Sequence, residues 1–107
     1  MKSARSKATD ITHNVRIEVA QRDGRRCIVC GKMDSLQCAH YISRSQGGLG
    51  IPENLGMLCI YCHNDLDNGN KPKVTRIIKE RFRDYLKHRY IGWNERMLVY
   101  SKYTKRK

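Results

Sequence analysis

The sequence predicts a small α+β domain in which a few short strands lie between helices at the two ends of the chain. Three observations lead to this prediction. The length of 107 residues implies one domain. An amphipathic helical pattern covers residues 74–90. Between residues 25 and 58, glycines and a proline divide the chain into segments that suit short strands and loops better than long helices.

The N-terminal region is expected to hold a disordered arm followed by one helix. Residues 1–8 are small, polar and basic, a composition typical of disorder. Asp10 is suited to cap a helix over residues 11–22. Its apolar positions recur at helical spacing: Ile11, Val15 and Val19. We therefore expect an N-terminal helical segment at residues 9–24 of a single domain that spans residues 1–107.

The central elements are expected to be short. The best strand candidate runs from Leu36 to Ile42, where branched and apolar residues occur without a glycine. A short helix is expected to start near Ile60 and to end by Gly69. The sequence thus predicts a compact central core at residues 25–70.

The C-terminal region, residues 71–107, is expected to be a basic helical extension. Its main helix has six apolar residues on one predicted face: Val74, Ile77, Ile78, Phe82, Tyr85 and Leu86. Basic side chains, Lys79 among them, fall largely on the opposite face. Asn94 is placed to cap a last short turn, and the run from Lys102 to Lys107 is expected to be a frayed tail.

The charge of the chain indicates a polyanionic partner. The formal net charge is +12, and all of the excess lies outside the centre: residues 1–26 carry +4, residues 27–63 carry zero and residues 64–107 carry +8. This distribution suits flanks that hold a nucleic acid around a centre with a more specific task. The alternative is a solvated basic surface that only keeps the protein soluble.

The sequence lacks an apolar run long enough for a transmembrane helix or for the hydrophobic segment of a secretory signal. We therefore expect a soluble, cytoplasmic protein. In such a reducing compartment, five cysteines with a visible pair spacing are more often a metal site than a disulfide framework.

Four of the five cysteines have the spacing of a zinc site. They form two CxxC pairs: Cys27 with Cys30, and Cys59 with Cys62. Two such pairs supply the four thiolates of a tetrahedral Zn²⁺ ion. The ion would stabilise a chain whose apolar content, 39%, is small for a self-sufficient core. The alternatives are buried free thiols or a redox pair, and Cys38 is expected to pack as a small apolar residue.

Three further residues, in order along the chain, carry a resemblance to a known family. They are His40 in AHYISRSQGG, Asn54 in IPENL and His63 in CIYCHNDLDNG. Together with both CxxC pairs, this pattern resembles the HNH endonuclease family, and more narrowly the small HNH proteins of Gram-positive bacteria and their phages. The resemblance implies a ββα-metal, treble-clef-like core with a zinc knuckle at residues 25–70.

The resemblance also implies an activity, that of a metal-dependent DNA endonuclease or nickase. His40 would be the general base, and Asn54 would bond to the loop backbone and so orient the strand that carries His40. His63 would hold Mg²⁺ or Mn²⁺, with Asp67 one helical turn later on the same helix face. Many HNH proteins have a further ligand just before the general base, where this chain has Ala39.

The partner implied by this activity is DNA, held mostly through its phosphates. Five basic residues near the motif are candidate contacts: Arg44, Arg25, Arg26, Lys71 and Lys73. Two other functions remain open. One is a zinc-stabilised nucleic-acid-binding module without catalysis. The other is an accessory protein of a phage packaging (terminase) or recombination machine, and in each case the expected location is the cytoplasm of a bacterial host cell.

Overall fold

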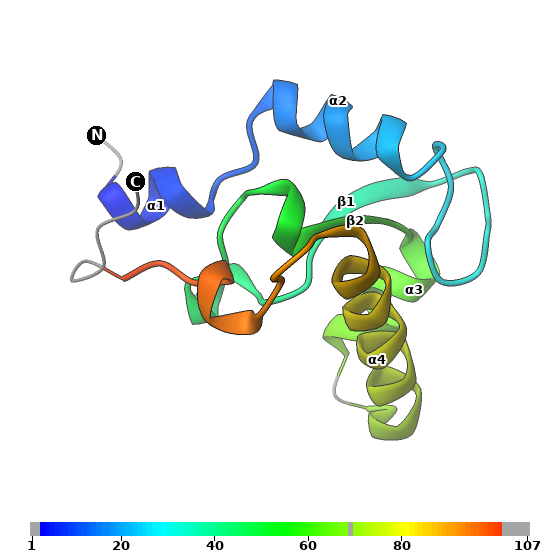
Figure 1. Cartoon of the computed structure of the whole chain (residues 1–107). Coiled ribbons are helices and arrows are strands. Elements are labelled where there is room, and N and C mark those ends of the chain that lie inside the picture. Colours follow the sequence, from blue (N-terminus) through cyan, green and yellow to red (C-terminus); the bar gives the residue numbers. More distant parts are fainter. Residues whose placement is uncertain (1–2, 69, 102–107) are drawn as a thin grey trace.

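A computed structural model describes residues 3–68 and 70–101, and its centre is a pair of antiparallel strands followed by a helix (Figure 1). Strand β1 (Leu36–His40) pairs with strand β2 (Leu55–Cys59), so that Leu36 lies opposite Cys59 and His40 opposite Leu55. Helix α3 (Ile60–Asp67) continues directly from β2. The predicted α+β class is therefore confirmed.

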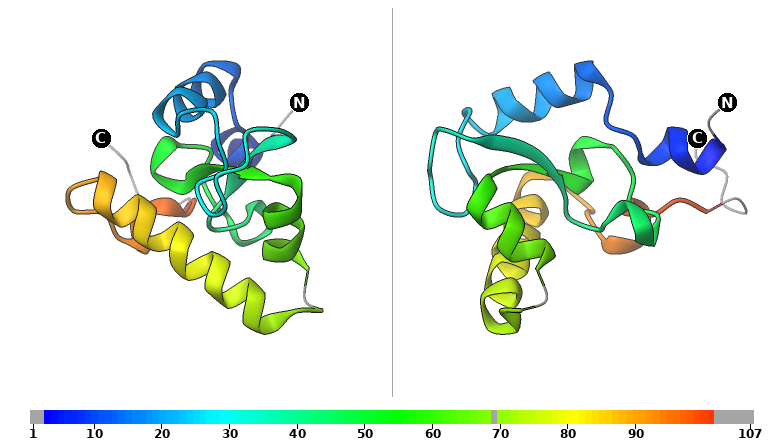
Figure 2. Two further views of the ribbon diagram at one scale, coloured as in Figure 1. Left: turned by 90° about the vertical axis from the view of Figure 1, so that its right-hand side faces the viewer. Right: turned by 180° about the vertical axis from the view of Figure 1, so that it is seen from behind.

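Helices cover both faces of the strand pair (Figures 1 and 2). Helix α2 (His13–Arg22) packs on one face, where Val19 meets Cys38, Leu55 and Met57. Helix α4 (Pro72–Arg89) lies with α3 on the other face, where Phe82 and Leu86 join a core with Ala39 and Leu58. Because strand side chains alternate between faces, residues 37 and 39 of β1 are directed to the α3 side.

The end of α2 is tied to β2 and to the loop before it. Arg22 donates hydrogen bonds to the carbonyl oxygens of Pro52 (2.8 Å) and Leu55 (2.6 Å), on either side of Asn54. Asp23 is buried and accepts a bond from the backbone N–H of Met57 at 2.8 Å. The same carboxylate pairs with Arg22 and accepts from the Tyr85 hydroxyl of α4, so its charge is compensated.

The described part of the N-terminal arm is helical, which corrects one expectation. Residues Ala4–Thr9 form helix α1. Ser3 caps this helix by accepting a bond from the Ser6 N–H, and Thr9 is buried against the rest of the molecule. Composition favoured disorder because these residues are small and polar. The contacts that order them come from residues 40–50, more than thirty positions later.

Helix α2 begins later than expected, because the cap is Thr12 and not Asp10. The Thr12 hydroxyl accepts a bond from the Val15 N–H at 3.2 Å. Asp10 instead terminates α1, where its backbone N–H bonds to the Ser6 carbonyl. Both residues have a side chain that suits a cap, so only the position of α1 separates them.

The other expected elements are found with small shifts. Strand β1 ends at His40, two residues early, because the Ile42 N–H bonds to the Asn54 side chain. Helix α4 buries Ile78, Phe82 and Leu86, while Val74 and Ile77 at its start stay exposed. Asn94 caps a 3-10 turn at Glu95–Leu98, as expected. Two more 3-10 turns lie at Arg44–Gln46 and Pro52–Asn54.

The expected frayed tail, Lys102 to Lys107, lies outside the described residues. Within residues 3–68 and 70–101, none of the helices has both the length and the apolar character needed to cross a membrane.

Candidate active site and metal centre

The four paired cysteines meet at one point between α2, β2 and α3. Cys27 and Cys30 lie in the turn after α2, Cys59 ends β2, and Cys62 lies in the first turn of α3. Their Sγ atoms all lie within 4.8 Å of one another, and those of Cys30 and Cys59 are 3.6 Å apart. A tetrahedral Zn²⁺ with Zn–S bonds of about 2.3 Å requires sulfur atoms about 3.8 Å apart. The cluster therefore fits a zinc ion.

Backbone N–H groups point to two of the four sulfur atoms. The Cys30 N–H points to Cys27 Sγ (3.5 Å), and the Cys62 N–H points to Cys59 Sγ (3.4 Å). Burial alone would raise the pKa of Cys27, but backbone N–H bonds outweigh it and lower the pKa to about 7. Gly31 has a φ of 82°, which closes the first turn through its bond to the Cys27 carbonyl. Cys38 lies apart, in the core on the α2 face, where burial raises its pKa.

Asn54 is fully buried and holds the chain just after β1. Its Oδ1 accepts from the Ile42 N–H (2.9 Å), and its Nδ2 donates to the carbonyl oxygens of Ile42 (3.1 Å) and Leu49 (2.9 Å). Its own carbonyl accepts from the Tyr41 N–H at 2.8 Å. One side chain thus joins both ends of the loop that leaves and re-enters the strand pair. The Asn54 side chain therefore bonds to the backbone of this loop.

His40, at the end of β1, has one ring nitrogen in contact with the N-terminal helix. Its Nε2 lies 2.9 Å from the carbonyl oxygen of Thr9. A carbonyl oxygen only accepts, so Nε2 carries the hydrogen, and in the neutral ring Nδ1 keeps the lone pair. Burial lowers the pKa of His40. The bond to the Thr9 carbonyl raises it, the charges of Arg44 and His63 lower it, and the net change in the pKa is downward. The ring is therefore neutral and able to accept a proton near neutral pH.

His63, in the first half of α3, is placed between a strand residue and a residue of its own helix. Its Nε2 lies 3.2 Å from Asp67 Oδ2. Its Nδ1 contacts Oε1 of Gln37, on the β1 face directed toward α3. The predicted pair of His63 and Asp67 is thus brought together. Gln37 was not predicted as a site residue. One signal for it was present in the sequence: residues 37 and 39 are two positions apart in a strand and therefore share a face.

The comparison with protein families concerns the same part of the chain. Residues 27–69 match the family model described as HNH endonuclease. This segment is less than half of the chain, and it is similar to the HNH endonuclease family. It contains both cysteine pairs and His40, Asn54 and His63, so the resemblance seen in the sequence is confirmed. A search of curated proteins and a search of solved structures found no significant match. The HNH family is one of nucleases, so the match indicates a nuclease-type function and a metal site.

Two further side chains near His40 bear on the candidate site, and one of them, Lys79, differs from the sequence-based expectation. Ala39, next to His40, is buried in the core and offers no ligand atom. Lys79 of α4 was expected on a solvent face, but it is half-buried, lies 4.6 Å from the centre of the Tyr41 ring and donates to the Tyr41 carbonyl at 2.9 Å. Burial lowers the pKa of Lys79. The backbone beside His40 is therefore held from two sides, by Asn54 and by Lys79.

The five basic residues proposed as DNA contacts are not equally close to the HNH site. Arg44 is exposed beside it, lowers the pKa of His40 and forms an ion pair with Asp10. Lys71 forms an ion pair with Asp65 of α3, with Nζ 3.8 Å from Oδ1. Within the described part of the chain, no hydrogen bond or ion pair connects Arg25, Arg26 or Lys73 with either histidine. All three are exposed on the surface.

Proposed function

We propose that this protein is a metal-dependent DNA endonuclease or nickase that hydrolyses phosphodiester bonds. The observation that carries the proposal is the state of His40 within the HNH segment. One ring nitrogen is engaged by the Thr9 carbonyl, the other keeps its lone pair, and the pKa is lowered. Those are the properties required of a general base near neutral pH.

His40 would act at its Nδ1, where it takes the proton of the water that attacks phosphorus. Asn54 serves to hold the backbone after β1, and with it the direction of the His40 ring. This role is one of positioning, because Asn54 is fully buried and its side chain bonds to backbone groups of Ile42 and Leu49. His40 lies opposite Leu55 in the strand pair, and Leu55 directly follows Asn54, so the two strands keep Asn54 and His40 close together.

His63 and Asp67 would hold Mg²⁺ or Mn²⁺, because an imidazole nitrogen and a carboxylate oxygen suit such ions. Their separation of 3.2 Å matches two neighbouring ligands of an octahedral ion, which are about 3.0 Å apart when ligand bonds are about 2.1 Å. When bound, the ion stabilises negative charge on the phosphate oxygens. Gln37 would keep the other nitrogen of His63 directed away from it.

Arg44 would contact phosphate oxygens near the cleaved bond, because its exposed guanidinium lies beside His40. The remaining candidates, Arg25, Arg26, Lys71 and Lys73, would hold the flanking backbone. The net charge of +12 supports this use. We expect binding to weaken steeply with salt, because such contacts release counterions.

The test is cleavage of supercoiled plasmid with Mg²⁺ or Mn²⁺ by the intact protein, His40→Ala and His13→Ala. His13 is an exposed histidine at the start of α2 and serves as the matched control. We expect the intact protein and His13→Ala to nick or linearise the plasmid only when the divalent ion is added. His40→Ala should bind the plasmid and leave it intact. Equal cleavage by His40→Ala would refute the assignment of the general base.

Ala39 favours a second candidate, a nucleic-acid-binding module that has the HNH fold without catalysis. The residue is buried and cannot coordinate an ion, so only His63 and Asp67 remain for the catalytic metal. For this candidate, the intact protein and His40→Ala would both shift the plasmid in a gel, and neither would cut it at any concentration of Mg²⁺ or Mn²⁺.

A further inference from the structure

Helix α1 is fastened to the loop that follows His40. Arg5 donates to the Ser45 carbonyl at 2.8 Å, and the Ala8 carbonyl accepts from the Gly50 N–H at 2.9 Å. Two more contacts reach the residues of the proposed site itself. The Thr9 carbonyl bonds to His40 Nε2, and the Asp10 carboxylate pairs with Arg44. The end of α1 thus contacts both the proposed general base and the proposed phosphate-binding arginine.

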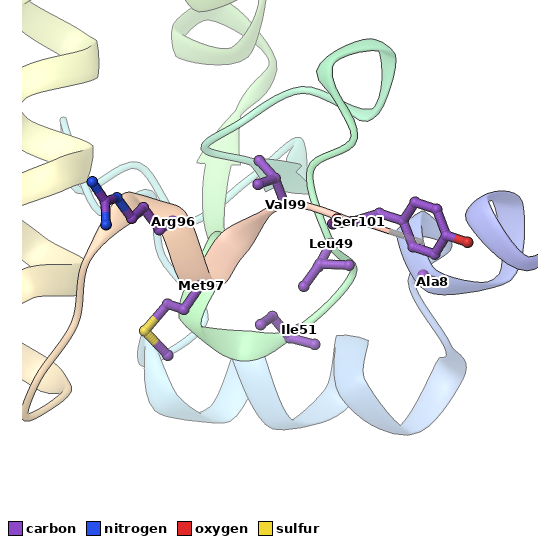
Figure 3. A pocket seen from close by; sticks show the side chains of 8 residues that line it. Ala8, Leu49, Ile51, Arg96, Met97, Val99 and Ser101 are labelled. Carbon is purple, nitrogen blue, oxygen red and sulfur yellow. The ribbon is translucent and has the colours of Figure 1, made fainter. Parts of the chain in front are cut away.

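Apolar packing contributes little to this docking. Thr9 is the one residue of α1 that is buried. Beside α1 lies a largely apolar cavity of about 680 Å³ between the helix, the 49–51 segment and the end of the described chain (Figure 3). Ala8 reaches its wall with only a methyl group, and Leu49 and Ile51 line it from the loop. The position of α1 therefore depends mainly on its polar contacts.

We propose that α1 is a positioning element of the HNH site, held by Arg5 and Gly50, and that its docking fixes the His40 ring and the Arg44 side chain for reaction. This inference rests on the proposed function for its effect on cleavage. The docking itself is independent of it, because it concerns contacts that are present without DNA. The HNH match covers residues 27–69, so it includes neither α1 nor the Thr9 carbonyl that bonds to His40.

Gly50 shows how closely the two segments approach. A Cβ atom at this position would lie 2.0 Å from the Asp10 carbonyl oxygen and 3.1 Å from that of Thr9. The obstructing atoms are backbone, so the clash can be relieved only if the end of α1 and the segment that carries Gly50 move apart. Gly50 is not among the glycines with positive φ, so alanine is compatible with its backbone conformation. Gly50→Ala is therefore a selective probe of the docking.

The experiment uses the zinc-loaded full chain and four variants: Gly50→Ala, Arg5→Ala, Arg5→Lys and Lys7→Ala. Lys7 is exposed on the same helix and, among the described residues, its side chain makes no hydrogen bond or ion pair, so it controls for loss of a positive charge. Two properties are measured. One is the ¹H–¹⁵N signal of His40 Nε2–H, which is protected from water only while it bonds to Thr9. The other is the rate of plasmid nicking at saturating protein.

We expect Gly50→Ala to lose the protected His40 Nε2–H signal and to nick on the order of tenfold more slowly or worse, because small displacements of a base are costly. Arg5→Ala should show the same changes to a smaller extent, and Arg5→Lys should restore them. Lys7→Ala should match the intact protein. Zinc content and thermal midpoint are recorded for each variant, so that unfolding is recognised.

Three outcomes would overturn the inference. A protected Nε2–H signal in folded Gly50→Ala would show that α1 does not determine the ring position. Loss of the protected signal with an unchanged nicking rate would show that the docking of α1 does not matter for cleavage. A faster nicking rate would show that α1 inhibits cleavage. If the intact protein does not nick, the proposed function fails, while the NMR comparison still decides whether α1 holds His40.

Discussion

Asn54 and Ile42 are twelve positions apart and form two hydrogen bonds with each other. The Asn54 amide accepts from the Ile42 N–H at 2.9 Å and donates to the Ile42 carbonyl at 3.1 Å. The side chain thereby imitates a strand neighbour, because it satisfies both backbone groups of one residue. β1 ends at His40, and at Ile42, two residues later, the Asn54 side chain takes the place of the neighbouring strand. Asn54 is fully buried, so it holds the backbone two residues after His40 from inside the protein.

We expect Asn54→Ala to destabilise the protein and to slow cleavage. The substitution leaves the Ile42 N–H and two carbonyl groups without their partner in a buried place, at a cost of about 1–3 kcal/mol. Urea denaturation of the zinc-loaded protein measures the change in the free energy of unfolding. Asn64→Ala, at an exposed position of α3, is the control and should be neutral. Equal stability of both variants would contradict the role given to Asn54.

Zinc removal is expected to unfold the central part of the chain. The four thiolates join the turn after α2 to β2 and α3. Structural Zn²⁺ contributes about 10–16 kcal/mol in small peptides, as much as the stability of a whole domain. Elemental analysis should find close to one zinc per chain. Cys30→Ala should lose most of the zinc and of the helical circular dichroism signal, whereas Cys38→Ala should keep both. A chain that folds fully without zinc would refute the site.

We expect the cleavage activity to persist to a lower pH than it would with a histidine base of ordinary pKa. Burial lowers the pKa of His40, so the ring stays neutral below the usual value of about 6.5. Activity should fall only as pH drops through the lowered pKa. The unfolded chain binds this proton more readily, so the stability that His40 contributes is present above about pH 6.5 and is lost as pH falls below it. An NMR titration of the His40 ring checks the direction, and a raised pKa would contradict the burial argument.

Filling the cavity beside α1 should stabilise the docked helix. Ala8→Leu adds three carbon atoms to a largely apolar wall, where each buried methylene contributes about 0.8 kcal/mol (Figure 3). We expect a gain of about 1–2 kcal/mol in the free energy of unfolding, with stronger protection of the His40 Nε2–H signal. Ala4→Leu, on an exposed position of the same helix, is the control and should give neither. A loss of stability in Ala8→Leu would show that the cavity cannot accept the larger side chain.

Local patterns in the sequence were sufficient for the metal cluster and for most elements. The CxxC spacing identified the four cysteines because each pair fits one turn, and two pairs complete one coordination shell. The period of 3.6 residues identified α4, since Ile78, Phe82 and Leu86 share its buried face. The family match then confirmed the segment with His40, Asn54 and His63. Their roles in the reaction stay predictions.

Contacts between distant segments were decided only by the tertiary structure. Helix α1 could not be predicted, because its composition is polar and its stabilising partners begin more than thirty residues later. Lys79 was misplaced for a related reason: helical periodicity separates two faces, but it does not show which charged side chain will lie over a tyrosine ring. The sequence by itself indicated which residues are candidates for the chemistry and for metal binding. Only the fold decided which backbone carbonyl meets His40 and which nitrogen remains free, since hydrogen bonds depend on distances that no local pattern contains.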